Sequence, residues 1–464
     1  MNKKWMAVIL MISILVLFPM RGLTALGDET QDFTQEFQRE TKCSSVSVVT
    51  YDHGVRNDYG EEEGLWQIGS MTKAFTGLAI QKLIHEGVLS EEDLVSDYLP
   101  EFEVYYQGKG PIKITIGQLL RQTSGFTNSE AKYPSAKEGE SLQEWVKRIS
   151  GKSVQTTPGS EYAYSNVNYN LLGAVIEVVS GESYREYMER EVLMPLGLSQ
   201  TYVGEPDKED TAAPKVIKGG RLLFRKAISY ALPVREGAIP AGYFYSSASD
   251  MARWMEIWIG TAEIPAEYQE VIGEVKSKLQ KKGDYYAGWE CFGDGVIGHS
   301  GGTPNYSSRI VFSDGEGLGT CVLTNLNVAA STDSLCNGIF DRMRGQGTGR
   351  IASDVWTVFD KIFSCLCILA FFAFLICIWC KKRGILMVMG STCAVLFAAL
   401  VISLPLIFGA SLLEIVVTWA PLSLAVFLGA LTLDALTAVV RWWMLRDHEN
   451  HKKTGEGTAA HGDH

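Results

Sequence analysis

The chain has 464 residues, enough for one large domain and an appended segment. Its formal net charge is −11, and the part before the C-terminal quarter has no long basic run, which argues against a nucleic-acid-binding protein. Of nine cysteines, the only C-x-x-C pair, Cys377 and Cys380, has no second Cys or His pair nearby, so no zinc site is expected. Four cysteines lie in residues 28–343, and the sequence leaves their pairing open.

Residues 1–27 have the pattern of a secretory signal peptide. Lys3 and Lys4 precede an apolar run from Trp5 to Phe18, and small residues around Ala25 follow. A cleaved signal and an uncleaved anchor both fit this pattern. Either one would export the segment that follows.

Residues 28–343 predict one domain with strands at both ends. The alternating β-branched residues of SSVSVVTYD (44–52) and the apolar run LWQI (65–68) predict strands joined by a turn-rich link. Two later strands, RIVFSD (309–314) and GTCVLTN (319–325), flank a turn that opens with Asp-Gly. We therefore expect one sheet that is closed by segments distant in sequence.

Helices are predicted between these strands. Apolar residues recur at helical spacing from Ser70 to Gly87, from Val167 to Ser180 and after the caps Ser249 and Asp250. Strands at both ends with helices between them predict a sheet flanked by helical layers.

The C-terminal quarter predicts three transmembrane helices within residues 362–446. Three apolar stretches, Ile362–Cys380, Ile385–Phe408 and Val416–Val440, are each near the roughly 20 residues that a helix needs to cross hydrocarbon. A linker (344–361) is expected before them, and a cytoplasmic tail (447–464) after them.

The charges around these stretches predict their orientation. Bases follow the first stretch at Lys381–Arg383 and the third from Arg441 onward, whereas the connection between the second and third has one acid, Glu414, and no base. By the positive-inside tendency the C-terminus is cytoplasmic and the large domain is extracytoplasmic. Asp434 lies within the third stretch, where it either reaches interfacial water or has a function in the bundle.

Ser70 and Lys73 form a Ser-x-x-Lys pair in QIGSMTKAF (67–75), at a strand-to-helix junction. Lys73 would lie one turn along the same helical face, and the unpaired N–H groups of a helix start suit a developing oxyanion. Ser70 would attack a carbonyl, and a Lys73 made neutral by burial would accept its proton. The alternative is an ordinary helix start, because a second Ser-x-x-Lys, Ser129 to Lys132, occurs in a polar loop.

Two further motifs favour the catalytic interpretation. In Tyr164-Ser165-Asn166, the tyrosine would transfer a proton to the leaving group and the asparagine would hold a substrate amide. The structural alternative is a helix entry with Asn166 as the N-cap. The glycines around His299 (298–302) would let the backbone of a substrate lie against a strand, and a backbone N–H of the protein would then point at the substrate carbonyl oxygen. The structural alternative is that His299 is an ordinary histidine in a turn.

Taken in order, Ser70-x-x-Lys73, Tyr164-Ser165-Asn166 and His299-Ser300-Gly301 resemble the three active-site motifs of serine β-lactamases and penicillin-binding proteins. The Tyr-x-Asn and His-x-Gly forms resemble the class C β-lactamase-related branch, which includes D-Ala-D-Ala carboxypeptidases, D-aminopeptidases and esterases. The likeness covers about residues 32–340. It implies an α/β fold of the α+β type, in which an antiparallel sheet is flanked by helices and joined to an all-helical subdomain, followed here by the three transmembrane helices.

The resemblance also implies a role for each motif residue. Ser70 would be the acylated nucleophile, Lys73 the base for acylation, and Tyr164 the group that assists proton transfer to the leaving group. Asn166 would orient substrate amides. The N–H groups of Ser70 and Gly302 would form the oxyanion hole.

The third motif departs from the family's more frequent pattern. His299 stands where lysine is more common, and with Gly301 and Gly302 it is expected to contact substrate. A histidine is mostly neutral at pH 7, so it lacks the fixed charge with which lysine attracts a substrate carboxylate. This change favours peptidase or esterase chemistry over efficient β-lactam hydrolysis.

The leading hypothesis is a membrane-anchored serine hydrolase that cleaves amide or ester bonds, such as those of D-amino-acid-containing peptides, outside the membrane. It needs no metal and no cofactor. Its layout is similar to that of membrane peptidases such as the colibactin-maturing peptidase. The alternatives are an acylatable penicillin-binding or sensor protein with little turnover, and a β-lactamase. Transport through the membrane helices has only Asp434 in its favour.

Overall fold

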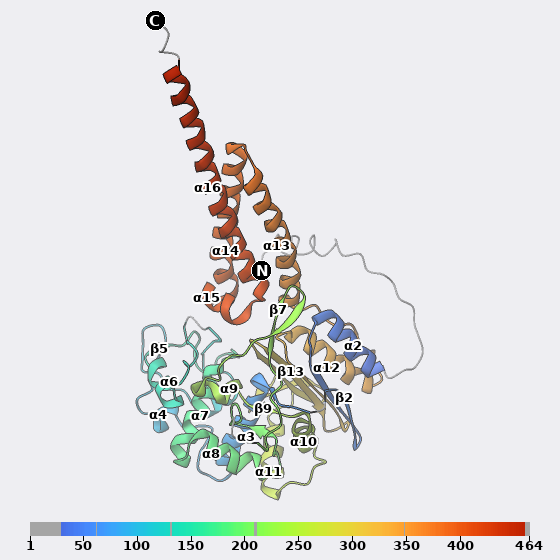
Figure 1. Ribbon diagram of the computed structural model, residues 1–464. Helices are drawn as coiled ribbons and strands as arrows, with labels where there is room; N and C mark the ends of the chain where they lie inside the picture. The colour runs from blue at the N-terminus through green and yellow to red at the C-terminus, as the bar shows by residue number, and fades with distance from the viewer. Residues whose placement is uncertain (1–28, 62, 130–131, 208–210, 348, 460–464) are drawn as a thin grey trace.

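The computed structural model describes residues 29–61, 63–129, 132–207, 211–347 and 349–459, with no side chains placed for 452–459. The predicted signal peptide, residues 1–27, lies outside the described residues. Figure 1 shows a rounded mixed α/β body from which a bundle of long helices projects.

A seven-stranded antiparallel sheet forms the centre of the body, in the order β10-β11-β12-β13-β14-β1-β2. Its strands are β10 (Tyr285–Tyr286), β11 (Trp289–Gly293), β12 (Val296–Thr303), β13 (Tyr306–Ser313), β14 (Leu318–Thr324), β1 (Val46–Asp52) and β2 (Val55–Gly60). The first strand in sequence pairs with the last, with Val46 opposite Thr324. The expected closure of one sheet by distant segments is therefore confirmed.

Helices cover both faces of this sheet. On one face, α2 (Glu29–Thr41) and α12 (Ala329–Met343) bury Phe33, Phe37 and Phe340 against strand residues such as Val322. On the other face, α10 (Ala248–Ile259) packs against β1 and β14. It buries the indole rings of Trp254 and Trp258, as its amphipathic pattern predicts.

The helical region beside the sheet is built around α3 (Thr72–His85). Nearly every residue of α3 is buried, because the helix is covered on all sides, and its buried residues include polar ones such as Lys73 and Gln81. A side chain at Gly77 would lie 2.2 Å from the carbonyl oxygen of Ala287, so α3 passes directly against the β10–β11 turn. The start of α3 is thereby held between the sheet and the helical region.

Other elements complete the helical region. Its helices are α4 (Val95–Tyr98), α5 (Ile116–Leu120), α6 (Leu142–Ile149), α7 (Asn166–Ser180), α8 (Tyr184–Met188), η2 (Glu189–Leu193), η3 (Glu236–Ala238), α9 (Ile239–Gly242) and α11 (Ala266–Ser277). The short strands are β3 (Trp66–Gln67), β4 (Val104–Tyr105), β5 (Lys152–Ser153), β6 (Thr201–Tyr202), β7 (Gly220–Leu223), β8 (Lys226–Ser229) and β9 (Tyr245–Ser246).

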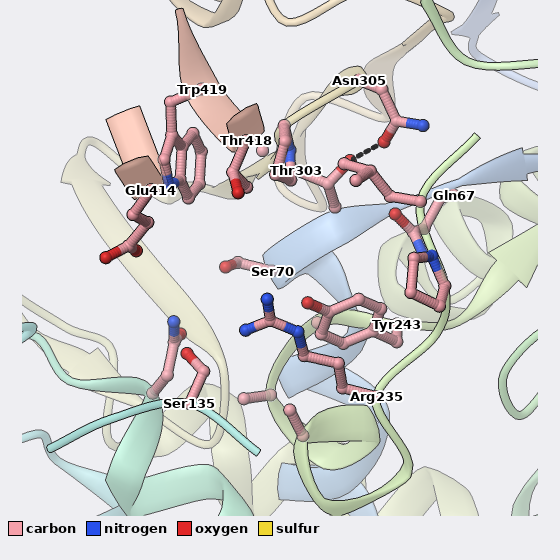
Figure 2. A pocket seen from close by; sticks show the side chains of 18 of the residues that line it. Gln67, Ser70, Ser135, Arg235, Tyr243, Thr303, Asn305, Glu414, Thr418 and Trp419 are labelled. Carbon is pink, nitrogen blue, oxygen red and sulfur yellow. Dashed lines mark hydrogen bonds between the residues drawn. The ribbon is translucent and has the colours of Figure 1, made fainter. Parts of the chain in front are cut away.

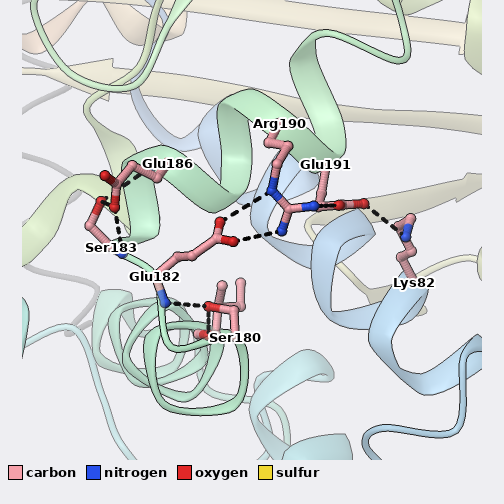
Figure 3. A network of polar contacts seen from close by, with 8 residues as sticks. Lys82, Ser180, Glu182, Ser183, Glu186, Arg190 and Glu191 are labelled. Atoms are coloured by element: carbon pink, nitrogen blue, oxygen red, sulfur yellow. Dashed lines mark hydrogen bonds and ion pairs between the residues drawn. The ribbon is translucent and has the colours of Figure 1, made fainter.

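A polar network ties α3 to the neighbouring helices, as Figure 3 shows. Lys82 of α3 pairs with Glu191 of η2 at 3.0 Å, and Arg190 pairs with Glu182 at 2.9 Å. Partly exposed ion pairs contribute only about 0–1 kcal/mol each. We infer that the network orients these elements, while the buried apolar core stabilises them.

Several sequence predictions differ from the structure in detail. The link after β1, expected as a turn-rich segment, contains β2, which pairs with β1 through its backbone. Helix α10 begins at Ala248, and its N-cap lies two residues before the expected Ser249, because the Ser247 side chain accepts the N-terminal hydrogen bond. Likewise Ser165, not Asn166, caps α7, which leaves the Asn166 side chain available for other contacts. The four cysteines in residues 28–343 are buried and unpaired among the described residues.

Three C-terminal helices are long and apolar enough to cross a membrane. They are α13 (Val355–Trp379), α14 (Arg383–Phe408) and the stretch Leu422–His451 of α16 (Leu422–Ala459), with mean hydropathies of 2.8, 2.5 and 2.0. The helix α13 begins within the segment expected as a linker. The third expected stretch began at Val416, but the structure places residues 412–419 in two short helices, α15 (Leu412–Glu414) and η4 (Ile415–Trp419), before Pro421 precedes the long helix.

Residues 409–421, here called the connector, join α14 to α16 and lie against the large domain (Figure 1). The buried guanidinium of Arg221, on β7, donates hydrogen bonds to the carbonyl oxygens of Val416 at 2.7 Å, Val417 at 2.5 Å and Ala420. The Tyr230 hydroxyl donates to the Val417 oxygen at 2.7 Å. The last carbonyls of a helix have no partner within it, so Arg221 satisfies them and fixes the connector on the domain.

Candidate active site

Ser70 lies in the single turn η1 (Gly69–Met71) between β3 and α3, beside the end of β12. Gly69 has a φ of +53°, and a side chain there would lie 2.5 Å from the backbone nitrogen of Gly302. Glycine at position 69 therefore lets the turn that carries Ser70 approach the end of β12. The structure thus brings the first and third sequence motifs together.

Lys73 is fully buried and its amine faces Ser70. Its Nζ lies 3.0 Å from Ser70 Oγ, 2.7 Å from Asn166 Oδ1 and 2.5 Å from the carbonyl oxygen of Ala241. None of the described acidic residues forms an ion pair with it. Burial lowers the pKa of the Lys73 amine well below its usual value.

The three contacts of Lys73 are all with oxygen atoms: Nζ donates to Asn166 Oδ1, to the Ala241 carbonyl oxygen and to Ser70 Oγ. Burial favours the neutral amine, which has two N–H groups and one lone pair. In that form the amine can keep its donations to Asn166 and Ala241 while its lone pair accepts the hydroxyl proton of Ser70. This is the arrangement that a general base for Ser70 requires.

Tyr164 lies on the other side of this pair. Lys73 Nζ is 4.9 Å from the centre of the Tyr164 ring. Burial raises the pKa of the Tyr164 phenol, and a hydrogen bond with Ser70 opposes that effect only in part. Tyr164 therefore remains a neutral phenol that can donate or relay a proton, and Lys73 is the better base of the two.

His299 is buried and neutral. Its Nδ1 lies 2.6 Å from the Ser300 carbonyl oxygen, so Nδ1–H donates there, and Nε2 accepts from the Tyr285 hydroxyl at 3.2 Å. Burial lowers the pKa of His299 to about 3. Its ring centre is 6.1 Å from that of Tyr164. His299 thus packs behind Tyr164 and is not among the residues that line the cavities at Ser70.

The two glycines after His299 have different environments. A side chain at Gly301 would lie 2.0 Å from the carbonyl oxygen of Ile68 and 2.1 Å from Ser308 Oγ, so this glycine permits close packing of β12 on the Ser70 turn. Gly302 is exposed, and a side chain there would meet open space. Of the two, Gly302 is the one that reaches the cavities.

Two cavities meet at Ser70, with volumes of about 130 Å³ and 270 Å³. Ser70, Asn166 and Gly302 line both of them. So do Glu414 and Trp419, which come from the connector between two apolar helices. The connector between two long apolar helices therefore contributes a wall to the candidate site.

Figure 2 shows this wall opposite the large domain. Trp419, Thr418 and Glu414 lie on one side of Ser70, and Arg235 and Tyr243 lie on the other. Local patterns did not indicate Arg235 or Trp419 as site residues. The one available signal was that Glu414 is the only charged residue between the second and third apolar stretches.

The described residues contain no group of three or more His, Cys, Asp or Glu side chains that could hold a metal ion.

Comparisons with known proteins agree with this geometry. Residues 31–337 match the model of the Beta-lactamase family. Protein flp of Staphylococcus aureus (strain COL) is 28% identical over 425 residues, which cover 84% of this chain and 82% of that protein.

Solved structures share the fold. A class C β-lactamase has a TM-score of 0.57 at 18% identity, over 67% of this chain and 94% of its own. The D-alanine carboxypeptidase AmpC from Burkholderia cenocepacia has a TM-score of 0.56 at 18% identity, over 68% of this chain and 98% of its own. The resemblance found in the sequence motifs is confirmed, and because the family match spans well over half of the chain, the protein belongs to the Beta-lactamase family of serine hydrolases.

Proposed function

We propose that the protein is a membrane-anchored serine hydrolase that cleaves amide or ester bonds outside the membrane through an acyl-enzyme. The observation that carries this proposal is the fully buried Lys73 amine, 3.0 Å from Ser70 Oγ and without an acidic partner among the described residues. A nucleophile beside a base held in its neutral form is the requirement for covalent catalysis.

In the acylation step, Ser70 Oγ attacks the substrate carbonyl carbon while its proton passes to Lys73 Nζ. The backbone N–H groups of Ser70 and Gly302 stabilise the oxygen that becomes negative. When the bond to the leaving group breaks, Tyr164 donates a proton to the departing nitrogen or oxygen and is reprotonated from Lys73. The products of this step are the free leaving group and an ester on Ser70.

In the deacylation step, water attacks the ester carbonyl. Tyr164 and Lys73 relay the water proton to Ser70 Oγ as the ester bond breaks, which releases the acid. Asn166 contacts Lys73 and lines both cavities, so it is placed to orient both the base and a substrate amide.

Peptides that contain D-amino acids are the candidate substrates. A structural neighbour is a D-alanine carboxypeptidase, and the fold is shared with it. The buried, neutral His299 offers no charge to the carboxylate of a β-lactam, which favours peptidase or esterase activity over β-lactamase activity. The three apolar helices support anchoring in a membrane, and the basic segments that follow α13 and end α16 support an extracytoplasmic catalytic domain.

The test uses the full-length protein in detergent and a fluorophosphonate probe, with mass spectrometry to locate the label. Labelling is expected at Ser70 and is expected to be absent in Ser70→Ala. The variant Ser277→Ala, at an exposed serine on α11, is the matched control and should label normally.

The role of Lys73 is tested by the same labelling reaction as a function of pH. Only the neutral amine accepts a proton, so the rate should rise with pH through the lowered pKa of Lys73 and then stay level. Lys73→Met is expected to slow labelling about 10²- to 10⁴-fold and to remove this dependence. Labelling of Lys73→Met at a near-normal rate would exclude Lys73 as the base.

Turnover is measured with a D-Ala-D-Ala peptide, a simple ester and nitrocefin. A hydrolase continues to release product after the first equivalent. A sensor or penicillin-binding protein stops near one equivalent.

A further inference from the structure

The two cavities at Ser70 differ in their chemical lining. The smaller one is lined by Arg235 and Tyr243 on the large domain, and the larger one by Tyr164 and the aromatic rings of Tyr133 and Trp145. A carbonyl carbon at Ser70 would have two substituents, and the two cavities that meet at Ser70 offer a separate space for each of them.

The position of Tyr164 decides which cavity holds the leaving group. Tyr164 lines the larger cavity and not the smaller one. Since the proposed function makes Tyr164 the proton donor to the leaving group, the leaving group occupies the larger cavity. The acyl part of the substrate then occupies the smaller cavity, on the side of Arg235.

Arg235 is the cation of this smaller cavity. Among the described residues that line it, Arg235 is the only one that carries a positive charge. Figure 2 shows its guanidinium pointing toward Ser70. Within the described chain no hydrogen bond or ion pair joins its side chain to another residue, although it is partly buried.

The backbone that carries Arg235 is held in place. The Arg235 carbonyl oxygen accepts a hydrogen bond from the Ala238 N–H at 2.9 Å, and the Gly237 N–H donates to the Glu140 carbonyl oxygen at 2.9 Å. The guanidinium, which carries five N–H donors, is therefore presented to the cavity by a fixed turn.

The other basic groups near Ser70 already have hydrogen-bond partners within the protein. Lys73 is surrounded by three oxygen atoms, and both ring nitrogens of His299 have partners. A planar guanidinium without a counterion matches a carboxylate, which it binds through two parallel hydrogen bonds.

We propose that Arg235 binds a carboxylate on the acyl part of the substrate, so that the enzyme prefers acyl groups that carry an acid at a distance from the reactive carbonyl. The proposal rests on the hydrolase function proposed above. It differs from a carboxylate site at position 299, because it lies on the acyl side of Ser70 and uses a residue outside the three motifs.

The connector restricts where this acid can bind. Glu414 lies at the junction of the two cavities, on the opposite side of Ser70 from Arg235 (Figure 2). Its carboxylate repels a second anion there, and so directs the substrate acid toward Arg235.

The test measures how well two matched amides protect Ser70 from the fluorophosphonate probe in the full-length protein. Glutaryl p-nitroanilide carries the acid, and its methyl ester is the neutral counterpart. The wild type is expected to bind the acid about tenfold or more tightly than the ester, as a charge-assisted bidentate contact predicts. Arg235→Gln should bind both equally, and Arg235→Lys should retain part of the preference. Glu414→Gln should bind the ester unchanged and the acid at least as tightly as the wild type does, because the substitution removes a negative charge from the site.

Two readouts separate this proposal from the hydrolase function itself. The neutral probe carries no acid, so its labelling of Ser70 in the wild type reports on the hydrolase function alone, whereas the difference between the acid and the ester reports on Arg235. The control Arg56→Gln removes an arginine from β2, four strands away from β12, and should keep the wild-type preference. A wild type without preference for the acid, or an Arg235→Gln variant that keeps it, would overturn the proposal even if Ser70 reacts normally.

Discussion

His299 shows how burial, rather than residue type alone, determines what a motif position does. Its ring is enclosed by Tyr164 and Tyr285, and both of its nitrogens have hydrogen-bond partners. The expectation that this histidine contacts substrate stays a prediction, and the structure places the ring behind the site. In this position the histidine ring packs beside Tyr164 without adding charge.

The low pKa of His299 predicts a loss of stability in acid. The unfolded chain binds a proton at His299 below a pKa of about 6.5, whereas the folded protein does so only near pH 3. Stability is therefore unaffected above the unfolded pKa and falls as the pH drops below it, by about 3 kcal/mol between pH 7 and pH 4.5. His299→Gln is expected to show a smaller drop in the thermal unfolding midpoint over this range.

The control for this measurement is His85→Gln. His85 lies at the end of α3, and the carboxylate of Glu274 raises its pKa, so this histidine stabilises the fold when protonated in acid. His85→Gln should not reduce the acid sensitivity. Equal acid sensitivity of His299→Gln and the wild type would contradict the buried, neutral state of His299.

At the scale of elements, the connector is the part of the chain whose role depends most on tertiary contacts. Residues 409–421 follow one apolar helix and precede another, yet Glu414, Thr418 and Trp419 line the cavity at Ser70. Arg221 holds them there through three carbonyl oxygens. The hairpin of β7 and β8 therefore joins the catalytic domain to the wall of its own active site.

Arg221→Met is expected to release the connector. The substitution keeps the apolar stem but removes the Arg221 donor from the carbonyl oxygens of Val416 and Ala420, while Val417 keeps the Tyr230 hydroxyl, at a cost of about 2–5 kcal/mol to docking. Amide hydrogen exchange in residues 415–421 should become faster. The KM for hydrolysis should rise more than kcat falls, because the cavity wall is lost while Ser70, Lys73 and Tyr164 stay in place.

Two variants of the same hairpin are its controls. Tyr230→Phe removes a single hydrogen bond to Val417 and should have a smaller effect of about 1 kcal/mol. Arg225→Gln should leave docking intact, because Arg225 contacts Asp360 of α13 through its backbone N–H. Normal exchange in Arg221→Met would show that other contacts hold the connector.

At the scale of the whole molecule, the bundle of α13, α14 and α16 projects away from the catalytic domain, and the connector lies at its near end (Figure 1). If these helices span a membrane, Ser70 lies close to its surface. The basic residues after α13 and toward the end of α16 lie at the far end of the bundle, where the positive-inside tendency assigns the cytoplasm.

This orientation is tested with epitope tags in intact cells. A tag inserted at the exposed turn Glu138–Gly139 is expected to be digested by added protease, and a tag after the C-terminus is expected to be protected. Permeabilised cells serve as the control, in which both tags should be digested. Digestion of the C-terminal tag alone in intact cells would reverse the proposed topology.

The sequence by itself determined the features that depend on residues close together along the chain. The start of α3 at the Ser70 turn, the helix that follows Tyr164 and the three long apolar helices all follow from spacing, capping residues and hydropathy within a few turns. The three motifs also indicated the family before any contact between them was known.

Only the tertiary structure decided how residues far apart in sequence combine. Ala241 supplies an acceptor for Lys73, Arg235 lines the smaller cavity, and Glu414 and Trp419 line the site from the connector. No local pattern encodes these contacts, because each depends on the packing of α9 against α3 or on the docking of the connector by Arg221. Burial, which makes Lys73 a base and His299 neutral, is likewise a property of the packed molecule.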